Sequence, residues 1–235
     1  MDRRSILRGA LATGALAALP ARALAQTVTD EFDKVFGQVP MAVPPVPAEP
    51  VVPSLPVIAP ANPLYDAKLR EIAKRELERA GATVWRRDLV GIADFARPST
   101  LPRLHFVNLE RGEIRSFLVS HGRGSDPAHS GFLQNFSNTV GSEATSRGAY
   151  LTAEWYKGKY GTSIRLLGLD ADNSNALDRA IVMHPAAYAA DDMIGRFGKL
   201  GRSEGCFAMG PTHFSEALWH LSGGRLLYAD RIELV

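Results

Sequence analysis

The chain has 235 residues, of which 46% are hydrophobic and 22% are charged, and its formal net charge is +2. Four arginines and one aspartate lie in residues 1–25, which leaves a net charge of about −1 for the rest of the chain. This composition is typical of a globular protein. It excludes a nucleic-acid-binding protein, because there is neither a basic patch nor a recognised binding motif.

Residues 1–25 have the features of an export signal. A charged segment, Met1–Arg8, precedes an apolar run, Gly9–Leu19, and an A-x-A cleavage site, Ala23–Ala25. The adjacent pair Arg3-Arg4 predicts a twin-arginine signal cleaved after residue 25, and the alternative is an ordinary secretory peptide. We therefore expect a periplasmic or otherwise extracytoplasmic protein. The apolar run is too short to span a bilayer, and no later segment predicts a transmembrane helix.

Residues 26–63 are predicted to be a proline-rich linker, with the prolines concentrated between residues 38 and 63. Such a tract favours extended polyproline-like conformations and forms neither a sheet nor a helix of its own. We interpret it as a spacer between the export signal and one folded domain, residues 64–235. That length is sufficient for a sizeable hydrophobic core.

The folded region begins with apolar residues at three- and four-residue steps, which predict a helix over residues 64–80 that stops at Gly81. Helical pattern returns only near residues 187–197 and 212–221. The rest consists of short strand candidates separated by turn residues. No strand–helix–strand alternation is visible, so we expect a single mainly β (α+β) domain with peripheral helices. The strand candidates are residues 103–109, 114–120, 149–155, 163–168, 180–184 and 226–234.

Cys206 is the only cysteine, so it has no partner for an intramolecular disulfide. A thiol and a histidine are the minimum for thiolate catalysis, and His184, at the end of a strand candidate, is the candidate base. Gly205 would allow close approach of a substrate and leave amide N–H groups to face an oxyanion. The alternative is a buried structural cysteine and a strand-end histidine with no chemical role.

Two other chemistries fit the sequence less well. Residues 201–205 match the G-x-S-x-G serine elbow, but that motif needs a parallel sheet and a histidine later in the chain. The only histidines after Ser203 are His213 and His220, both in a helical pattern. None of the six histidines has zinc-site spacing, so we expect no metal and no cofactor.

Several motifs occur in an order that resembles a known family. They are S-H-G-x-G-S at residues 120–125, F-S-N-x-x-G-S at residues 136–142, His184 on a strand end, and G-R-S-x-G-C at residues 201–206. The region from about residue 84 to 222 is similar to the L,D-transpeptidase catalytic domain, in particular its murein L,D-transpeptidase branch. The resemblance implies a β-sandwich domain with peripheral helices.

The resemblance also implies an enzyme of cell-wall biogenesis whose partners are peptidoglycan stem peptides. Cys206 would attack the third, L-centred residue of a tetrapeptide stem, with His184 as base and Gly205 at the oxyanion site. An amine from a second stem would then complete a 3→3 cross-link. The alternatives are an L,D-carboxypeptidase or other peptidoglycan hydrolase of the same fold, and an inactive wall-binding protein.

The chain departs from the family pattern around the cysteine. Glu204 stands where relatives have histidine, Phe207-Ala208-Met209 stands where many have an arginine, and Pro185 replaces the more usual glycine. In an extended strand Glu204 would share a face with Cys206, so we hypothesise that it orients His184. The alternative is a solvated surface glutamate. Candidate substrate-binding residues are His121, Arg202 and Ser203, the last of which could instead support the cysteine loop.

Overall fold

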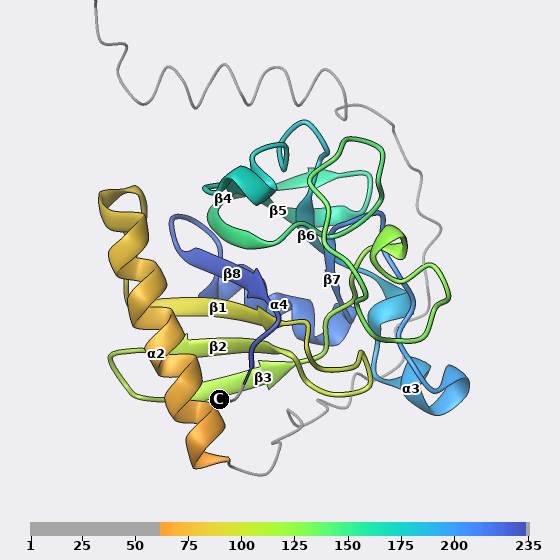
Figure 1. The fold of residues 1–235 in the computed structure, drawn as a ribbon, viewed down its shortest axis with the longest axis horizontal. Coiled ribbons are helices and arrows are strands. Elements are labelled where there is room, and N and C mark those ends of the chain that lie inside the picture. The colour runs from red at the N-terminus through yellow and green to blue at the C-terminus, as the bar shows by residue number, and fades with distance from the viewer. Residues whose placement is uncertain (1–61, 234–235) are drawn as a thin grey trace, which may run out of the picture. The chain divides into compact units, whose positions relative to one another are not determined.

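The structure is a computed structural model that describes residues 62–233 (Figure 1). The predicted export signal and nearly all of the predicted linker lie outside the described residues. Within residues 62–233, no helix has both the length and the apolar composition needed to cross a membrane.

The first described element is the helix α2 (Pro63–Ala80), as the sequence predicts. The Asn62 side chain caps its N-terminus by accepting a hydrogen bond from the Tyr65 amide at 3.2 Å, and proline follows at the first helical position. The helix ends at Gly81, whose φ of 58° is readily adopted only by glycine. One apolar face, which includes Leu69, Ile72, Ala73 and Leu77, packs against the sheet.

The eight strands in the described part of the chain belong to one mixed sheet, in the order β3-β2-β1-β8-β4-β5-β6-β7. The C-terminal strand β8 lies between β1 and β4, parallel to β1 and antiparallel to β4. The second parallel pair is β6–β7, at the far edge of the sheet. The strands are β1 (Leu89–Asp94), β2 (Leu104–Asn108), β3 (Ile114–Phe117), β4 (Gly148–Gly158), β5 (Gly161–Gly168), β6 (Val182–Pro185), β7 (Phe207–Met209) and β8 (Leu226–Asp230).

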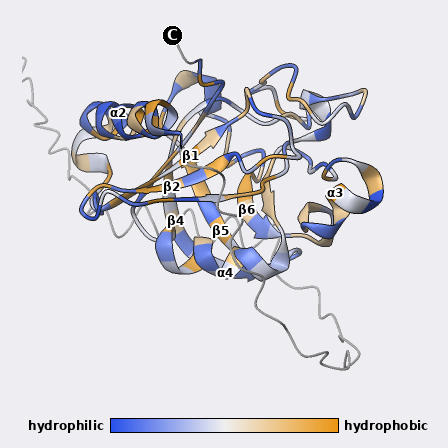
Figure 2. Cartoon of the chain, turned by 90° about the horizontal axis from the view of Figure 1, so that it is seen from below, coloured by the Kyte–Doolittle hydropathy of each residue, from blue (hydrophilic) through white to orange (hydrophobic). Residues whose placement is uncertain are grey.

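Two hydrophobic clusters cover the two faces of this sheet. One lies beneath α2, and the other includes residues of α4 (Pro211–His220). Figure 2 shows these two helices on opposite sides of the strands. The other helices within residues 62–233 are α3 (Asp192–Phe197) and four short 3-10 helices: η1 (Gly81–Thr83), η2 (Arg123–Ser125), η3 (Ala171–Asn173) and η4 (Ala187–Ala189). The predicted mainly β fold with peripheral helices is therefore confirmed.

All six strand candidates correspond to strands, but β1 and β7 are absent from the prediction. Every residue of β1 is buried, so the strand lacks the alternation of apolar and polar residues that marks a half-exposed strand. β7 has only three residues. Its position is set by pairing with β6 rather than by a local pattern.

We expect Leu69→Ala to destabilise the domain, because this side chain of α2 is fully buried. Removing it leaves a cavity that typically costs about 2–5 kcal/mol of unfolding free energy. Leu64→Ala is the matched control, since Leu64 lies on the same helix and is 80% exposed. Chemical denaturation of both variants checks this, and equal loss of stability would contradict the packing of α2 on the sheet.

Candidate active site

The β6–β7 ladder brings the candidate nucleophile and base to the same edge of the sheet. His184 pairs with Ala208 in parallel register, so Cys206, two residues earlier, lies beside the start of β6. The Cys206 thiol donates to the carbonyl of Ala180 at 3.6 Å, just before that strand. The structure thus brings together two residues that are 22 positions apart in the sequence.

The turn before Cys206 requires a glycine. Gly205 has a φ of +113°, which residues with a side chain rarely adopt. A Cβ atom at this position would lie 2.7 Å from Ile181 Cδ1 and 2.8 Å from the Ala144 carbonyl oxygen. Its amide donates to Ser203 Oγ at 3.2 Å, so in this state the amide predicted to face an oxyanion is used inside the loop.

The imidazole of His184 is held in one tautomer. Nδ1 lies 3.0 Å from the carbonyl oxygen of Pro185, which can only accept, so Nδ1 carries the proton and Nε2 keeps its lone pair. The ring stacks on Tyr160 with a centroid distance of 4.4 Å, and Tyr188 approaches edge-on at 6.5 Å. Burial lowers the pKa of His184, so the ring is neutral near neutral pH and can accept a proton at Nε2.

The Cys206 side chain is also neutral at rest. The pKa of the Cys206 thiol is raised to about 11, mainly by burial, with the negative charge of Glu204 as a smaller contribution. The backbone N–H of Val182 and the cation of Arg179 act in the opposite direction. Near neutral pH the resting pair is therefore a thiol and a neutral imidazole.

Glu204 does not occupy the place that the sequence hypothesis gave it. Its side chain is 59% exposed, and its carboxylate lies 3.6 Å from Arg123 Nη2 in an ion pair. The backbone at Gly205 is not extended, so the alternation of faces that would put Glu204 beside Cys206 does not hold. The carbonyl of Pro185 makes the orienting contact to His184 instead.

Ser203 supports the cysteine loop, as the sequence suggested. Its hydroxyl donates to the Cys206 carbonyl at 2.6 Å and accepts from the Gly205 amide. With this proton engaged and the side chain buried, Ser203 is not placed as the nucleophile of a serine elbow.

His121 and Arg202, predicted as substrate contacts, are instead buried or bound to backbone. His121 is 1% exposed; its Nδ1 accepts from Arg103 Nη2 at 2.8 Å, and its Nε2 lies 3.4 Å from Asp126 Oδ2. Arg202 donates to the carbonyls of Asp126 and Pro127. The sequence could not separate a cleft residue from a buried one, because both occur in glycine-rich loops.

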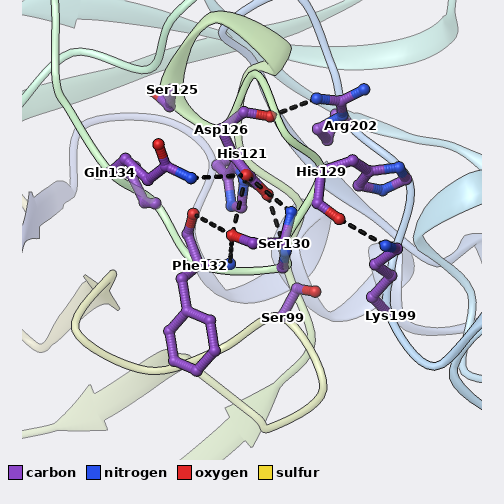
Figure 3. A network of polar contacts seen from close by, with 12 residues as sticks. Ser99, His121, Ser125, Asp126, His129, Ser130, Phe132, Gln134, Lys199 and Arg202 are labelled. Atoms are coloured by element: carbon purple, nitrogen blue, oxygen red, sulfur yellow. Dashed lines mark hydrogen bonds and ion pairs between the residues drawn. The ribbon is translucent and has the colours of Figure 1, made fainter.

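Asp126 is the centre of this polar network (Figure 3). Its carboxylate accepts from the amides of Ser130 and Gly131, both at 2.8 Å, and from the Ser130 hydroxyl at 2.9 Å. Burial and the neighbouring Arg103 lower the pKa of His121 to about 3, so its ring stays neutral. Through His121 and Asp126, this network holds the S-H-G-x-G-S segment, residues 120–125, in place.

That segment in turn holds the cysteine loop through its backbone. The Ser203 amide donates to the His121 carbonyl at 2.9 Å, and the Arg123 amide donates to the Ser203 carbonyl at 2.7 Å. Ser120 adds an amide hydrogen bond to Ala208 at 2.8 Å, in β7 itself. The motif that first suggested a substrate contact therefore supports the cysteine loop.

A groove of about 550 Å³ opens beside Tyr188, on the side of η4 and α3. It offers a mainly apolar surface next to the ring that faces His184, with Asp192 and Arg196 adding one charge of each sign. The lining residues include Ala190, Met193, Phe197 and Pro211. Within residues 62–233, no group of three or more histidine, cysteine or acidic side chains is placed to hold a metal ion.

We expect Gly122→Ala to displace the cysteine loop and lower the stability. The added Cβ would lie 2.3 Å from the Glu143 carbonyl oxygen and 2.7 Å from Gly205 Cα, both backbone atoms. Such overpacking typically costs about 1–3 kcal/mol. Gly195→Ala is the control, because a Cβ there meets nothing within 4 Å. Thermal unfolding should separate the two variants, and equal midpoints would contradict the close crossing of the two loops.

We expect Glu204→Gln to make the thiol more acidic, because the carboxylate raises the pKa of Cys206. The thiolate fraction at a fixed pH near 8 should rise, and alkylation by iodoacetamide should become severalfold faster. Intact-mass kinetics are unambiguous, since the chain has one cysteine. Slower alkylation than in the wild type would show that Glu204 instead assists the thiolate.

The family described as the L,D-transpeptidase catalytic domain matches residues 64–229, whereas none of the curated proteins matches the sequence. A solved L,D-transpeptidase from Mycobacterium smegmatis is 15% identical with a TM-score of 0.38, over 61% of this chain and 58% of that chain. L,D-transpeptidase 1 of Mycobacterium tuberculosis is 13% identical with a TM-score of 0.35, over 61% of each chain. The helical cell shape determining protein Pgp2 from Campylobacter jejuni is 12% identical with a TM-score of 0.41, over 68% of this chain and 56% of that chain.

The chain thus spans less than two thirds of the length of each of these solved structures. The family match covers the region from α2 into β8, including His184 and the cysteine loop. On this match, the chain belongs to the L,D-transpeptidase catalytic domain family.

Proposed function

We propose that this protein is a cysteine acyltransferase that forms 3→3 cross-links between peptidoglycan stem peptides, with Cys206 as nucleophile and His184 as base. The observation that carries the proposal is the β6–β7 edge, where both residues are buried in adjacent strand ends. The Pro185 carbonyl fixes the proton on His184 Nδ1 and leaves Nε2 as the acceptor. A neutral imidazole with a free lone pair, on the strand beside the thiol, supports the role of His184 as base.

In the first half-reaction, His184 Nε2 takes the thiol proton as Sγ attacks the carbonyl carbon of the third, L-centred residue. The tetrahedral intermediate collapses, the C–N bond to the terminal D-alanine breaks, and His184 returns the proton to the leaving amine. The acyl group remains as a thioester on Cys206. Backbone amides near Gly205 and Cys206 are the donors available to the oxyanion. The Gly205 amide would first have to break its hydrogen bond to Ser203 Oγ before it could donate to the oxyanion.

In the second half-reaction, the side-chain amine of another stem attacks the thioester carbonyl. The C–S bond breaks as the new amide forms, and the amine proton passes through His184 to the Cys206 thiolate. Water in place of the amine would give hydrolysis. Exclusion of water therefore matters, and the burial of Cys206, which is 6% exposed, favours transfer to a bound amine.

The groove beside Tyr188 supports binding of an extended peptide close to this pair. Its apolar lining can cover the aliphatic parts of a stem peptide. Two charged lining residues, Asp192 and Arg196, form an ion pair with each other at 3.5 Å, which a charged group of the peptide would have to displace. The export signal predicted for residues 1–25 supports a periplasmic location, where peptidoglycan is assembled.

We expect imipenem to form one covalent adduct with the folded chain at Cys206. This carbapenem was bound in a solved L,D-transpeptidase structure, and its strained amide is a surrogate for the stem-peptide carbonyl. Whole-protein mass spectrometry should show the adduct in the wild type and lose it in Cys206→Ala. His184→Ala should slow acylation by about a hundredfold or more, because the base is removed.

A matched control is His213→Ala, which removes a partly buried histidine that contacts Asp191 instead of the cysteine loop. This variant should be acylated like the wild type. An adduct that persists in Cys206→Ala, or a folded wild type that forms none, would contradict the proposed nucleophile.

A further inference from the structure

We propose that Arg179 is a positioning residue of the active site, which holds the cysteine loop in place and supplies the positive charge that faces the Cys206 thiolate. The inference rests on the proposed function, since it gives a role in thiol activation to a residue outside the sequence motifs. Arg179 lies in the turn between η3 and β6, next to the residue whose carbonyl accepts from the thiol.

The guanidinium group of Arg179 makes three hydrogen bonds, all to neutral acceptors. Nη1 donates to the Ser137 carbonyl at 2.6 Å and to Ser146 Oγ at 2.5 Å, and Nη2 donates to the Ala144 carbonyl. None of these partners cancels the positive charge. These hydrogen bonds also connect the segment that carries the F-S-N-x-x-G-S motif, residues 136–142, to the turn that precedes β6.

The same group lies against the glycine that precedes the nucleophile. A Cβ atom on Gly205 would be 3.2 Å from Arg179 Nη2 and 2.8 Å from the Ala144 oxygen to which Nη2 donates. On the other side, Ala180 has a φ of +51°, which is uncommon for a residue with a side chain. This conformation directs the Ala180 carbonyl to the thiol, so Arg179 and its neighbour contact both ends of the Gly205-Cys206 unit.

The other groups around the thiol do not provide this charge. Phe207, Ala208 and Met209, which follow it in β7, are buried and apolar. Burial lowers the pKa of His184 and raises the pKa values of Tyr150 and Tyr188, so these three rings are neutral near neutral pH. The remaining charges are the Glu204 carboxylate, which opposes thiolate formation, and Arg123, which pairs with Glu143 and Glu204.

The electrostatics agree with this geometry. Burial lowers the pKa of Arg179, and the cysteine acts to raise it, while Arg179 lowers the pKa of Cys206. An anion on Cys206 and a cation on Arg179 therefore stabilise each other. The effect matters most once proton transfer to His184 has begun, because the thiolate then has to be held in a buried site.

The test is the pH dependence of alkylation of the full chain by iodoacetamide, followed by intact mass. Arg179→Met removes the charge and keeps much of the side-chain volume, and Arg179→Lys keeps the charge but loses the fork of donors. At a fixed pH near 8, we expect a severalfold slower alkylation in Arg179→Met, no larger than the opposite effect of Glu204→Gln, because one nearby charge is lost. Arg179→Lys should stay close to the wild-type rate, because it keeps the charge.

Arg147→Met is the matched control, because it also removes one positive charge. Arg147 is exposed and pairs with Asp172. Its alkylation rate should equal that of the wild type. Equal rates for wild type and a folded Arg179→Met would overturn the inference. So would an equal loss in the lysine and methionine variants, since that would assign Arg179 to packing alone.

If Arg179→Met does not fold by circular dichroism, Arg179→Gln replaces it under the same criterion, since its amide can still donate to the carbonyls. Alkylation requires no wall substrate, so this test is separate from that of the proposed function. Acylation by imipenem with no effect of Arg179 would overturn this inference alone. An effect of Arg179 without acylation would support the charge assignment and contradict the acyltransferase proposal.

Discussion

The site depends on one close crossing of two backbone segments, in which Gly122 lies against Gly205. A Cβ atom on either glycine would meet backbone atoms at less than 3 Å. The crossing allows the S-H-G-x-G-S segment to hydrogen-bond to the cysteine loop on both sides of Ser203. Because β7 has only three residues, these contacts and the β6 ladder together determine where Cys206 lies.

Burial determines the electrostatic state of the resting site. It raises the pKa of the thiol to about 11 and lowers the pKa of the histidine, so neither partner is charged near neutral pH. A thiol in this state reacts slowly with small reagents near neutral pH, because little of it is thiolate. In the proposed reaction, a substrate that excludes water and brings its carbonyl to Sγ would favour proton transfer as the bond forms. The buried network of Arg103, His121 and Asp126 lies beside the segment that hydrogen-bonds to the cysteine loop.

Much of the fold could be predicted because its elements have local signatures. The helix α2 has an amphipathic pattern and a glycine stop, and six strands have turn residues at their ends. The strand β1 could not be predicted, since burial on both faces removes the alternation. The position of β8 between β1 and β4 could not be predicted from the sequence either, because it depends on pairing between segments far apart in the chain.

The site could be predicted in part, for similar reasons. Cys206 and His184 were identified by residue type and resemblance, and the structure brings them to the same edge of the sheet. The orienting role hypothesised for Glu204 assumed an extended backbone at Gly205, which instead has a φ of +113°, and the Glu204 carboxylate pairs with Arg123. Arg179 was not identified, since its partners are backbone carbonyls and a serine hydroxyl from 33 to 42 residues earlier. An arginine with such partners leaves no motif in the sequence.

The most direct measurement is incubation of the full chain with a purified disaccharide-tetrapeptide, followed by mass spectrometry of the products. If Cys206 transfers the acyl group to a second stem, D-alanine is released, a 3→3 cross-linked dimer accumulates, and both disappear in Cys206→Ala. Release of D-alanine with the tripeptide as the only product would contradict acyl transfer to an amine and identify a hydrolase. Unchanged tetrapeptide with a folded wild type would contradict the catalytic role of this site.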